Sequence, residues 1–325
     1  MKKKLNVLIS NVSYQAATGS FLKMLRHSQY YDCYIVGCDF LLKGFSSGSM
    51  LVDKFYQASN QFSESEYASF ILEICKNENI DIVLSAEEKD LIMFKKMQLE
   101  QSLHTYIAEE SIFNLFKDKH LANLDVQEKS ILTPKTIMGR TDFDNSIKNK
   151  FIMRKRVSCC SRGIKIFDRR DIPSNYDSFT NDYITQEFIS GSVYTVDVFC
   201  DKLGNARIMI PRKGLAGKDG TTFKCIIERE GHILDVCKKF YSQYKVPGIS
   251  NIQFIVKDDR PYFIELNPRA AATIIASSLA SVNFLDLYIS HFLYDEEISD
   301  YDTMMNNVKW NSVVSRYYQE TIMYR

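Results

Sequence analysis

The N-terminal part of the sequence alternates short apolar segments with helical patterns, and this alternation limits the fold more than any other feature. Strands are predicted at residues 5–10, 33–37 and 81–85, and helices at about 19–27, 64–77 and 87–101. Strands and helices that alternate in this way form parallel sheets with helical crossovers. Residues 1–115 are therefore expected to form an α/β domain with a doubly wound parallel sheet.

Polar residues follow these predicted strands, at the place where open α/β sheets bind their ligands. The first junction, Ser10 to Gly19, contains one glycine, so the dinucleotide fingerprint G-x-G-x-x-G is absent and no NAD site is expected. The junction is still a candidate lining for a substrate pocket. Glu87, Glu88 and Asp90 at the third junction have two interpretations: charge at a helix N-terminus, or contact with a substrate amine.

The pattern changes after Pro134, where short strands become frequent. Strands are predicted at 151–156, 164–167, 183–189, 194–200 and 206–210, and a helix at about 233–244 precedes strands at 248–257 and 260–266. Asp201 to Gly204 has the composition of a hairpin turn. Because this spacing favours antiparallel pairing, the second part of the chain is expected to be α+β.

Length and composition disfavour several classes of protein. A chain of 325 residues is long enough for two or three packed subdomains, and a net charge of +1 gives no general attraction to nucleic acid. No apolar stretch approaches the roughly 18 residues of a membrane helix, so no membrane contact is expected. The eight cysteines include no C-x-x-C pair, which indicates a reduced, cytoplasmic location and argues against zinc.

The strongest chemical signal lies on the strands at 248–257 and 260–266. Glu265 and Asn267 project from one face, and Gln253 joins them if the hairpin pairs in that register. Three oxygen donors of this kind suit Mg²⁺, which also takes oxygens from nucleotide phosphates and water. The alternative is a plain solvent-facing strand. Arg269 follows at once and argues for a site, because it can hold a phosphate or a carboxylate.

These strands resemble the metal-binding strands of the ATP-grasp superfamily, in particular the ATP-binding halves of the carbamoyl phosphate synthase large chain and related carboxylate–amine ligases. The resemblance is carried by Ser250-Asn-Ile-Gln-Phe and Glu265-Leu-Asn-Pro-Arg269. It implies that Gln253, Glu265 and Asn267 hold Mg²⁺ ions on ATP, with Mn²⁺ as a second candidate. It also implies that Arg269 contacts the transferred phosphoryl group or the substrate, where a cation neutralises charge.

Residues 153–163 resemble the strand and small-residue loop that cover the triphosphate in the same superfamily. The cofactor-binding candidates in this segment are Arg154, Ser161, Arg162 and Gly163. Small residues allow such a loop to wrap phosphates with its backbone N–H groups. Cys159 and Cys160 occupy positions where the family often has glycine, which implies a stiffer loop. Without the resemblance, the basic residues here indicate only an exposed strand edge.

Residues 185–191 resemble the hinge that receives adenine. The resemblance places Glu187 at the exocyclic amine and Phe188 and Ile189 at the backbone contact. Val193 stands where the family usually has an acidic residue for the ribose hydroxyls, and this implies a weaker ribose contact. Lys119 matches the helix that begins the ATP-grasp region, although a surface lysine fits the sequence nearly as well.

Arg212 is the last site candidate. It resembles a basic residue that binds substrate or phosphate in related ligases, so we expect it in the catalytic site with Arg269. The following segment, 214–220, is rich in glycine and lacks apolar periodicity, which predicts either a mobile flap or a plain surface loop. The stretch through Trp310 and Arg316 is compatible with a closing strand.

The resemblance implies an ATP-grasp fold with a Rossmann-like domain at 1–115, a lid subdomain at 116–184 and a large metal-binding subdomain at 185–325. The last two clasp ATP. It further implies an ADP-forming ligase that converts a carboxylate to an acyl phosphate and joins it to an amine. Both substrates are small molecules, an amino acid among them by resemblance, and a homodimer is one expected assembly. The alternatives are a degenerate nucleotide-binding module and a small-carboxylate or carbamate phosphoryl-transfer enzyme.

Overall fold

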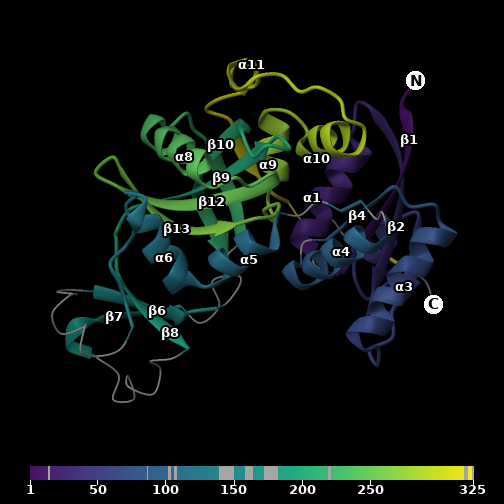
Figure 1. Ribbon diagram of the computed structural model, residues 1–325, viewed down its shortest axis with the longest axis horizontal. Helices are drawn as coiled ribbons and strands as arrows, with labels where there is room; N and C mark the ends of the chain where they lie inside the picture. Colours follow the sequence, from purple (N-terminus) through teal and green to yellow (C-terminus); the bar gives the residue numbers. More distant parts are fainter. Residues whose placement is uncertain are drawn as a thin grey trace.

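The protein folds around three β-sheets that follow one another along the chain (Figure 1). The computed structural model describes residues 1–13, 15–85, 87–101, 104–105, 108–138, 150–157, 164–171, 182–218, 221–317 and 321–323. Within this described part, no helix has both the length and the apolar character needed to span a bilayer. The mixture of a parallel sheet and antiparallel sheets confirms the predicted α/β and α+β organisation.

The first sheet is parallel, with the strand order β3-β2-β1-β4. It comprises β1 (Lys3–Ser10), β2 (Tyr31–Asp39), β3 (Lys54–Gln57) and β4 (Ile82–Leu84), with helices α1 (Gln15–Arg26), α2 (Gly48–Leu51), α3 (Glu64–Asn77) and α4 (Glu88–Gln101). The parallel sheet predicted from strand–helix alternation is therefore confirmed. Helix α1 begins before its predicted start, and β3 is too short for the sequence to show alternation.

The large sheet is antiparallel, with the order β13-β12-β9-β10-β11-β14. Its strands are β9 (Ser192–Cys200), β10 (Ala206–Lys218), β11 (Thr221–Ile227), β12 (Gly248–Lys257), β13 (Arg260–Asn267) and β14 (Val313–Ser315). Helix α8 (Gly231–Gln243) packs on this sheet, and α9 (Ile275–Ala280) and α10 (Phe284–Tyr288) connect it to α1. The π-helical turn η3 (Ile289–Leu293) and α11 (Tyr301–Asn306) follow, and β14 is the closing strand expected from the sequence.

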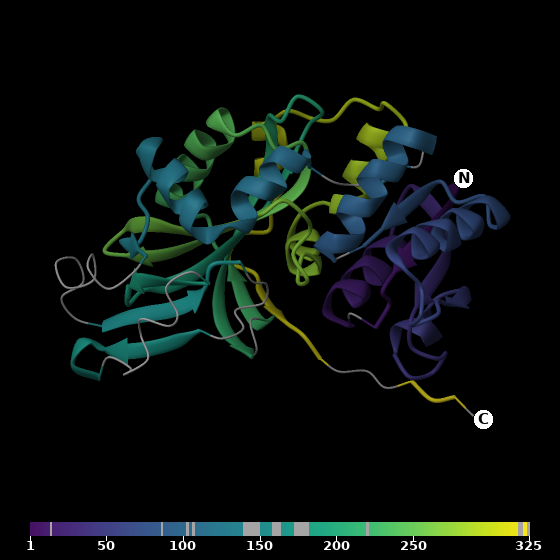
Figure 2. The ribbon, with the colours of Figure 1, turned by 60° about the horizontal axis from the view of Figure 1, so that its bottom comes forward.

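The small sheet lies beside the large one and has the order β5-β8-β6-β7 (Figure 2). Its strands are β5 (Thr136–Ile137), β6 (Lys150–Lys155), β7 (Lys165–Asp168) and β8 (Tyr183–Glu187), and the 3₁₀ turn η1 (Arg169–Asp171) follows β7. Helices α5 (Glu110–Lys117) and α6 (Lys119–Glu128) precede it. Strand β8 pairs with β5 and β6 and belongs to the small sheet, and the expected subdomain boundary between residues 184 and 185 falls inside this strand.

The glycine-rich segment 214–220 differs from its prediction. Strand β10 continues to Lys218 and pairs with β11, with register shifts between Gly214 and Gly217. Glycine has no side chain to show the alternation that identifies a strand, and for this reason the sequence predicted a flap or loop. The segment is instead the exposed end of a hairpin, while residues 219–220 lie outside the described residues.

An aromatic cluster fixes β13 against the helices behind it. The ring centroid of Phe240 in α8 lies 5.6 Å from that of Phe116, 5.8 Å from that of Phe263 and 4.5 Å from that of Tyr244. Phe240 and Phe263 are fully buried. Aromatic pairs at such separations add to the stabilisation that apolar burial provides. The strand that carries the predicted metal ligands is therefore held from its opposite face.

Phe240→Ala should lower the free energy of unfolding by about 3–5 kcal/mol, because it removes a fully buried ring and leaves a cavity. Phe62→Ala, at a half-exposed ring, should cost about 1 kcal/mol or less and serves as the matched control. Urea unfolding followed by circular dichroism measures both. Equal costs for the two variants would contradict the central role of the cluster.

Candidate functional site

One face of the large sheet collects the three predicted metal ligands. Gln253 of β12 lies opposite Glu265 of β13, and Asn251 lies opposite Asn267. Opposed residues of an antiparallel pair project to the same side, and so do residues two apart along a strand. The hairpin register on which the prediction depended is therefore confirmed.

A β-bulge at Ile264 produces this arrangement. Phe254 pairs with Phe263 while Gln253 pairs with Glu265, so Ile264 is the extra residue of β13. Phe263 consequently points into the core, and the Glu265 side chain, 27% exposed, points to the other face. Bulges commonly re-aim side chains in this way beside active sites.

Hydrogen bonds connect the polar side chains of this face. Asn267 Nδ2 donates to Glu265 Oε1 and to Asn251 Oδ1, both at 3.2 Å. Amide and carboxylate oxygens are the hard donors that Mg²⁺ prefers, and phosphates and water complete its shell. No group of three or more His, Cys, Asp or Glu residues that could hold a metal ion occurs among the described residues, so this site would rely on one carboxylate and two amide oxygens. Gln253, Glu265 and Asn267 therefore fit a magnesium ion.

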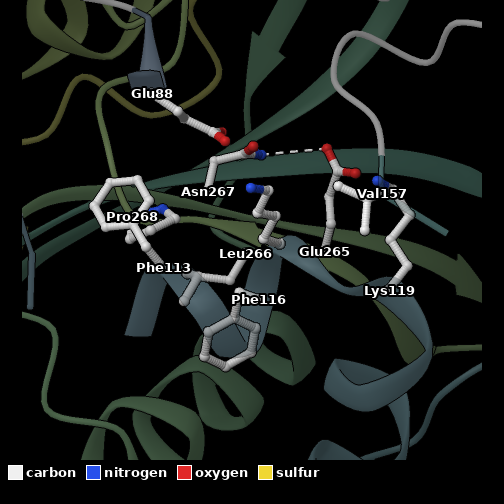
Figure 3. Close-up of a pocket in the computed structure, with 10 residues that line it drawn as sticks. Glu88, Phe113, Phe116, Lys119, Val157, Glu265, Leu266, Asn267 and Pro268 are labelled. Carbon is white, nitrogen blue, oxygen red and sulfur yellow. Dashed lines mark hydrogen bonds between the residues drawn. The ribbon is translucent and has the colours of Figure 1, made fainter. Parts of the chain in front are cut away.

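A cavity of about 210 Å³ opens beside Glu265 and Asn267. Its lining includes Glu88, Phe113, Lys117, Lys119, Glu265 and Asn267. Figure 3 shows Glu88 entering opposite Asn267, and Lys119 extending toward Glu265 from the other side. The cavity thus combines an apolar wall with polar groups of both charges, which is the usual composition of a small-molecule site.

Lys119, predicted to contact ATP, is placed on the cavity by the start of α6. Asp118 caps this helix, accepting from the backbone N–H groups of His120 at 3.0 Å and Leu121 at 3.2 Å. Arg156 Nε donates to Asp118 at 2.7 Å, and the Arg156 carbonyl accepts from the Lys119 N–H at 3.1 Å. The segment that follows β6 and the start of α6 are therefore locked together, and Lys119 is almost fully buried at the cavity.

Arg154, predicted to bind phosphate, lies between the small sheet and the bulge. Its Nη2 donates to the carbonyl of Ile264 at 3.2 Å, and its Nη1 lies 3.9 Å from Glu265 Oε2. Burial lowers the pKa of this guanidinium, and Glu265 opposes that effect. Its Nε is buried and has no hydrogen-bond partner among the described residues. Arg154 thus presents a cation directly beside the strand of the metal ligands.

Arg269 joins this strand to the N-terminal region. Its Nε lies 3.4 Å from Glu88 Oε1, and its Nη2 donates to Asn267 Oδ1 at 3.4 Å. Glu88 lies in the first turn of α4, as the helix-terminus interpretation of the acidic junction requires. Because Glu88 also lines the cavity, the substrate-amine interpretation stays a prediction.

Behind Glu88, the acidic junction contains a buried carboxylate. Asp90 Oδ2 accepts from Ser10 Oγ at 2.6 Å and from Asn11 Nδ2 at 2.7 Å. Burial raises the pKa of Asp90, although these hydrogen bonds act in the opposite direction. Burial, reinforced by the neighbouring Asp90, also raises the pKa of Glu87.

Arg212 lies deeper than the sequence predicted. It is 2% exposed, and its Nε and Nη2 donate to the two carboxylate oxygens of Asp197 at 2.8 Å and 3.2 Å. Burial alone would lower the pKa of its guanidinium, but Asp197 outweighs burial and raises it. Arg212 is turned toward Asp197 and is not among the residues that line the cavity, so its direct contact with substrate stays a prediction.

The predicted adenine hinge, residues 185–191, comprises the end of β8 and the segment after it. Glu187 is exposed, Phe188 is half-buried and Ile189 is buried, and the Phe188 N–H donates to the Lys150 carbonyl at 3.1 Å. Val193, 47% exposed, lies two residues before Thr195, which pairs with Gln253, so it shares the face of the metal ligands. The predicted loop residues Ser161, Arg162 and Gly163, with Cys159 and Cys160, lie outside the described residues.

Asn251 is a site residue that the sequence argument missed. It is 2% exposed, accepts from Asn267, and donates through Nδ2 to the Arg269 carbonyl at 2.9 Å. A signal was present, because Asn251 stands two residues before Gln253 and so belongs to the same face. Phe113, which lines the cavity from α5, has no such signal in the sequence.

Comparison with known proteins identifies the family of the large sheet. Residues 179–314 match the family model described as "ATP-grasp in the biosynthetic pathway with Ter operon". This match covers less than half of the chain and places its large sheet in the ATP-grasp superfamily. The matched residues contain β9 to β13 and therefore the whole face that carries Gln253, Glu265 and Asn267.

Relatives of this protein include the tyramine–L-glutamate ligase of Methanocaldococcus jannaschii. It is 23% identical over 219 residues, which cover 65% of this chain and 63% of that ligase. The match thus spans less than two thirds of the relative's length.

Solved structures share the ATP-grasp fold over almost the whole chain. The biotin carboxylase domain dimer of Hydrogenobacter thermophilus 2-oxoglutarate carboxylase, in complex with MgADP, ADP and bicarbonate, has a TM-score of 0.70 at 13% identity and covers 95% of this chain and 73% of that one. The L-amino acid ligase from Bacillus licheniformis has a TM-score of 0.64 at 14% identity, covering 90% and 75%.

Asp90→Asn tests the raised pKa of the buried carboxyl. Between the ordinary value of 3.8 and the raised pKa, the folded state binds more protons than the unfolded state, so this group's contribution to stability falls as pH rises. The free energy of unfolding of the wild type, minus that of Asp90→Asn, should therefore be smaller at about pH 7 than at about pH 4. Urea unfolding at both pH values measures it, and a larger difference at the higher pH would refute the assignment.

Proposed function

We propose that this protein is an ADP-forming carboxylate–amine ligase that binds Mg-ATP between the small and large sheets. The observation that carries the proposal is the set of oxygen ligands Gln253, Glu265 and Asn267, which share one face beside a cavity with Lys119. The ligases among the similar proteins support the reaction class. The division into an N-terminal domain, a lid and a large subdomain is part of the same proposal.

Each group at the cavity has a task in this reaction. Gln253, Glu265 and Asn267 would hold Mg²⁺, which supplies neutralisation of phosphate charge. Lys119 and Arg154 would add positive charge on the side of the small sheet, and Arg269 would contact the transferred phosphoryl group. Such transfers depend mainly on positioning and electrostatics, so no side-chain nucleophile is needed.

The proposed chemistry has two balanced steps. A substrate carboxylate oxygen attacks the γ-phosphorus of ATP, and the bond to the bridging oxygen breaks to release ADP. An amine nitrogen then attacks the acyl carbon, inorganic phosphate leaves, and the amine loses a proton. The product is an amide or peptide bond, and we propose an amino acid as one substrate.

The test is ADP release with Mg-ATP, pools of amino acids and small carboxylates, and hydroxylamine as the trapping amine. Release that requires a carboxylate and yields a hydroxamate is expected. Glu265→Gln should lower the rate by about 100-fold or more, because it removes a charged metal ligand. The exposed Glu73→Gln in α3 is the matched control and should keep the wild-type rate.

Other outcomes would favour the alternative functions. Carboxylate-dependent ADP release that no amine accelerates or converts to an amide would indicate a phosphoryl-transfer enzyme. Absence of both ADP release and nucleotide binding would indicate a degenerate module, and the exposed Val193 on the ribose side is the feature that favours this reading.

Val193→Glu should tighten ATP binding by about tenfold, because a carboxylate at this exposed position on the metal-ligand face can accept from the ribose hydroxyls. Titration with a fluorescent ATP analogue, displaced by ATP, measures the change. The control ligand is 2′,3′-dideoxy-ATP, whose affinity should not rise. An equal gain for both nucleotides, or no gain for either, would disprove the ribose contact.

A further inference from the structure

The loop 268–274 carries Arg269 away from β13 and is tied down from several elements. From β12, Asn251 Nδ2 donates to the Arg269 carbonyl at 2.9 Å. From α1, Ser20 Oγ donates to the Ala272 carbonyl at 2.7 Å. A backbone fixed at these points leaves the Arg269 side chain few directions to take.

Arg212 supplies the attachment from β10. Its Nη1 donates to Thr273 Oγ1 at 3.0 Å, and its other nitrogens bind Asp197 of β9. Arg212 and Asp197 have side chains that are 1% and 0% exposed. A buried ion pair of this kind is maintained only when its geometry is good and its remaining donors and acceptors are satisfied. Thr273 is one of the groups that satisfy it.

Asp197 extends the same connection to both sides. Its Oδ2 accepts from Ser277 Oγ at 2.6 Å, which attaches α9, the helix that follows the loop. In the sheet, Asp197 lies directly opposite Asn251, the residue that holds Asn267 and the Arg269 carbonyl. The Arg212–Asp197 pair therefore contacts the loop near its end, at Thr273. Asp197 also lies opposite Asn251, which binds the loop near its start, at the Arg269 carbonyl.

We propose that Arg212 is a positioning residue: together with Asp197 it fixes the loop 268–274 and so holds the Arg269 guanidinium against Asn267 and Glu88, two residues that line the cavity. This inference rests on the proposed function for the role of Arg269. It replaces a direct substrate contact, because the Arg212 guanidinium donates to Asp197 and Thr273, which lie inside the protein. The effect of Arg212 on the reaction should therefore pass through Arg269.

Thr273→Val is the sharpest probe of this inference. It removes the hydroxyl that Arg212 binds and keeps the side-chain volume, whereas Arg212→Ala would strand the buried Asp197 carboxylate and endanger folding. A displaced loop should lower kcat for ADP release by about 10- to 100-fold while the KM for ATP stays within about twofold. Thr105→Val, which removes a buried hydroxyl that donates to the Val83 carbonyl at 3.1 Å, is the control and should keep wild-type kinetics.

A double-mutant cycle shows whether the effect passes through Arg269. In an Arg269→Lys background, Thr273→Val should change kcat by no more than about twofold, because the group that it positions is already altered. If Thr273→Val lowers kcat by the same factor in both backgrounds, or acts only on a KM, the positioning role is overturned.

Hydrogen–deuterium exchange tests the anchoring without activity. In the ligand-free protein, Thr273→Val should exchange faster than wild type in peptides covering 268–280, and Thr105→Val should match wild type there. Unchanged exchange in Thr273→Val would overturn the inference. Faster exchange in a protein whose wild type releases no ADP with any substrate would retain the anchoring and reject the proposed function, so the two failures are distinguishable.

Discussion

The single extra residue in β13 is the constraint on which the rest of the site depends. With Ile264 bulged, Phe263 enters the aromatic core and Glu265 turns to the opposite face. In a regular strand the two side chains would share a face. Either the ring would lie in the site, at a cost of about 1.5–3 kcal/mol of lost burial, or an ionised carboxylate would enter the core at several times that cost.

The polar face beyond the bulge is continuous across four strands. Asn267 on β13, Asn251 on β12 and Asp197 on β9 pair with one another in register, and Arg212 on β10 pairs with Thr195, two residues from Asp197 on the same face. Sheet geometry alone brings these residues together, although they are far apart in sequence. Because the opposite face is apolar and packed on α8, the sheet acts as a rigid support, and rigid support is what catalysis by positioning requires.

The sequence predicted those parts of the fold that depend on local periodicity. The parallel sheet followed from the alternation of strands and helices, and the hairpin of β12 and β13 from the spacing of its strands. The register of Gln253 and Glu265 was only a condition of the metal-site prediction, because the bulge at Ile264 interrupts the alternation of side chains. The extension of β10 was not predicted, because its glycines carry no pattern. Arg212 was expected at the substrate because its sequence context does not reveal Asp197, a partner on another strand. Asn251 could have been predicted from alternation, because it lies two residues before Gln253 and so shares its face of the sheet.

The contact between Arg154 and the Ile264 carbonyl also restricts how the two sheets can move. It attaches β6 of the small sheet to the bulge of the large one. A movement of the small sheet that preserves this bond keeps the Arg154 guanidinium beside residue 264. The small sheet and the large sheet are therefore coupled at a point immediately beside Glu265, so a displacement of either sheet is felt at the metal ligands.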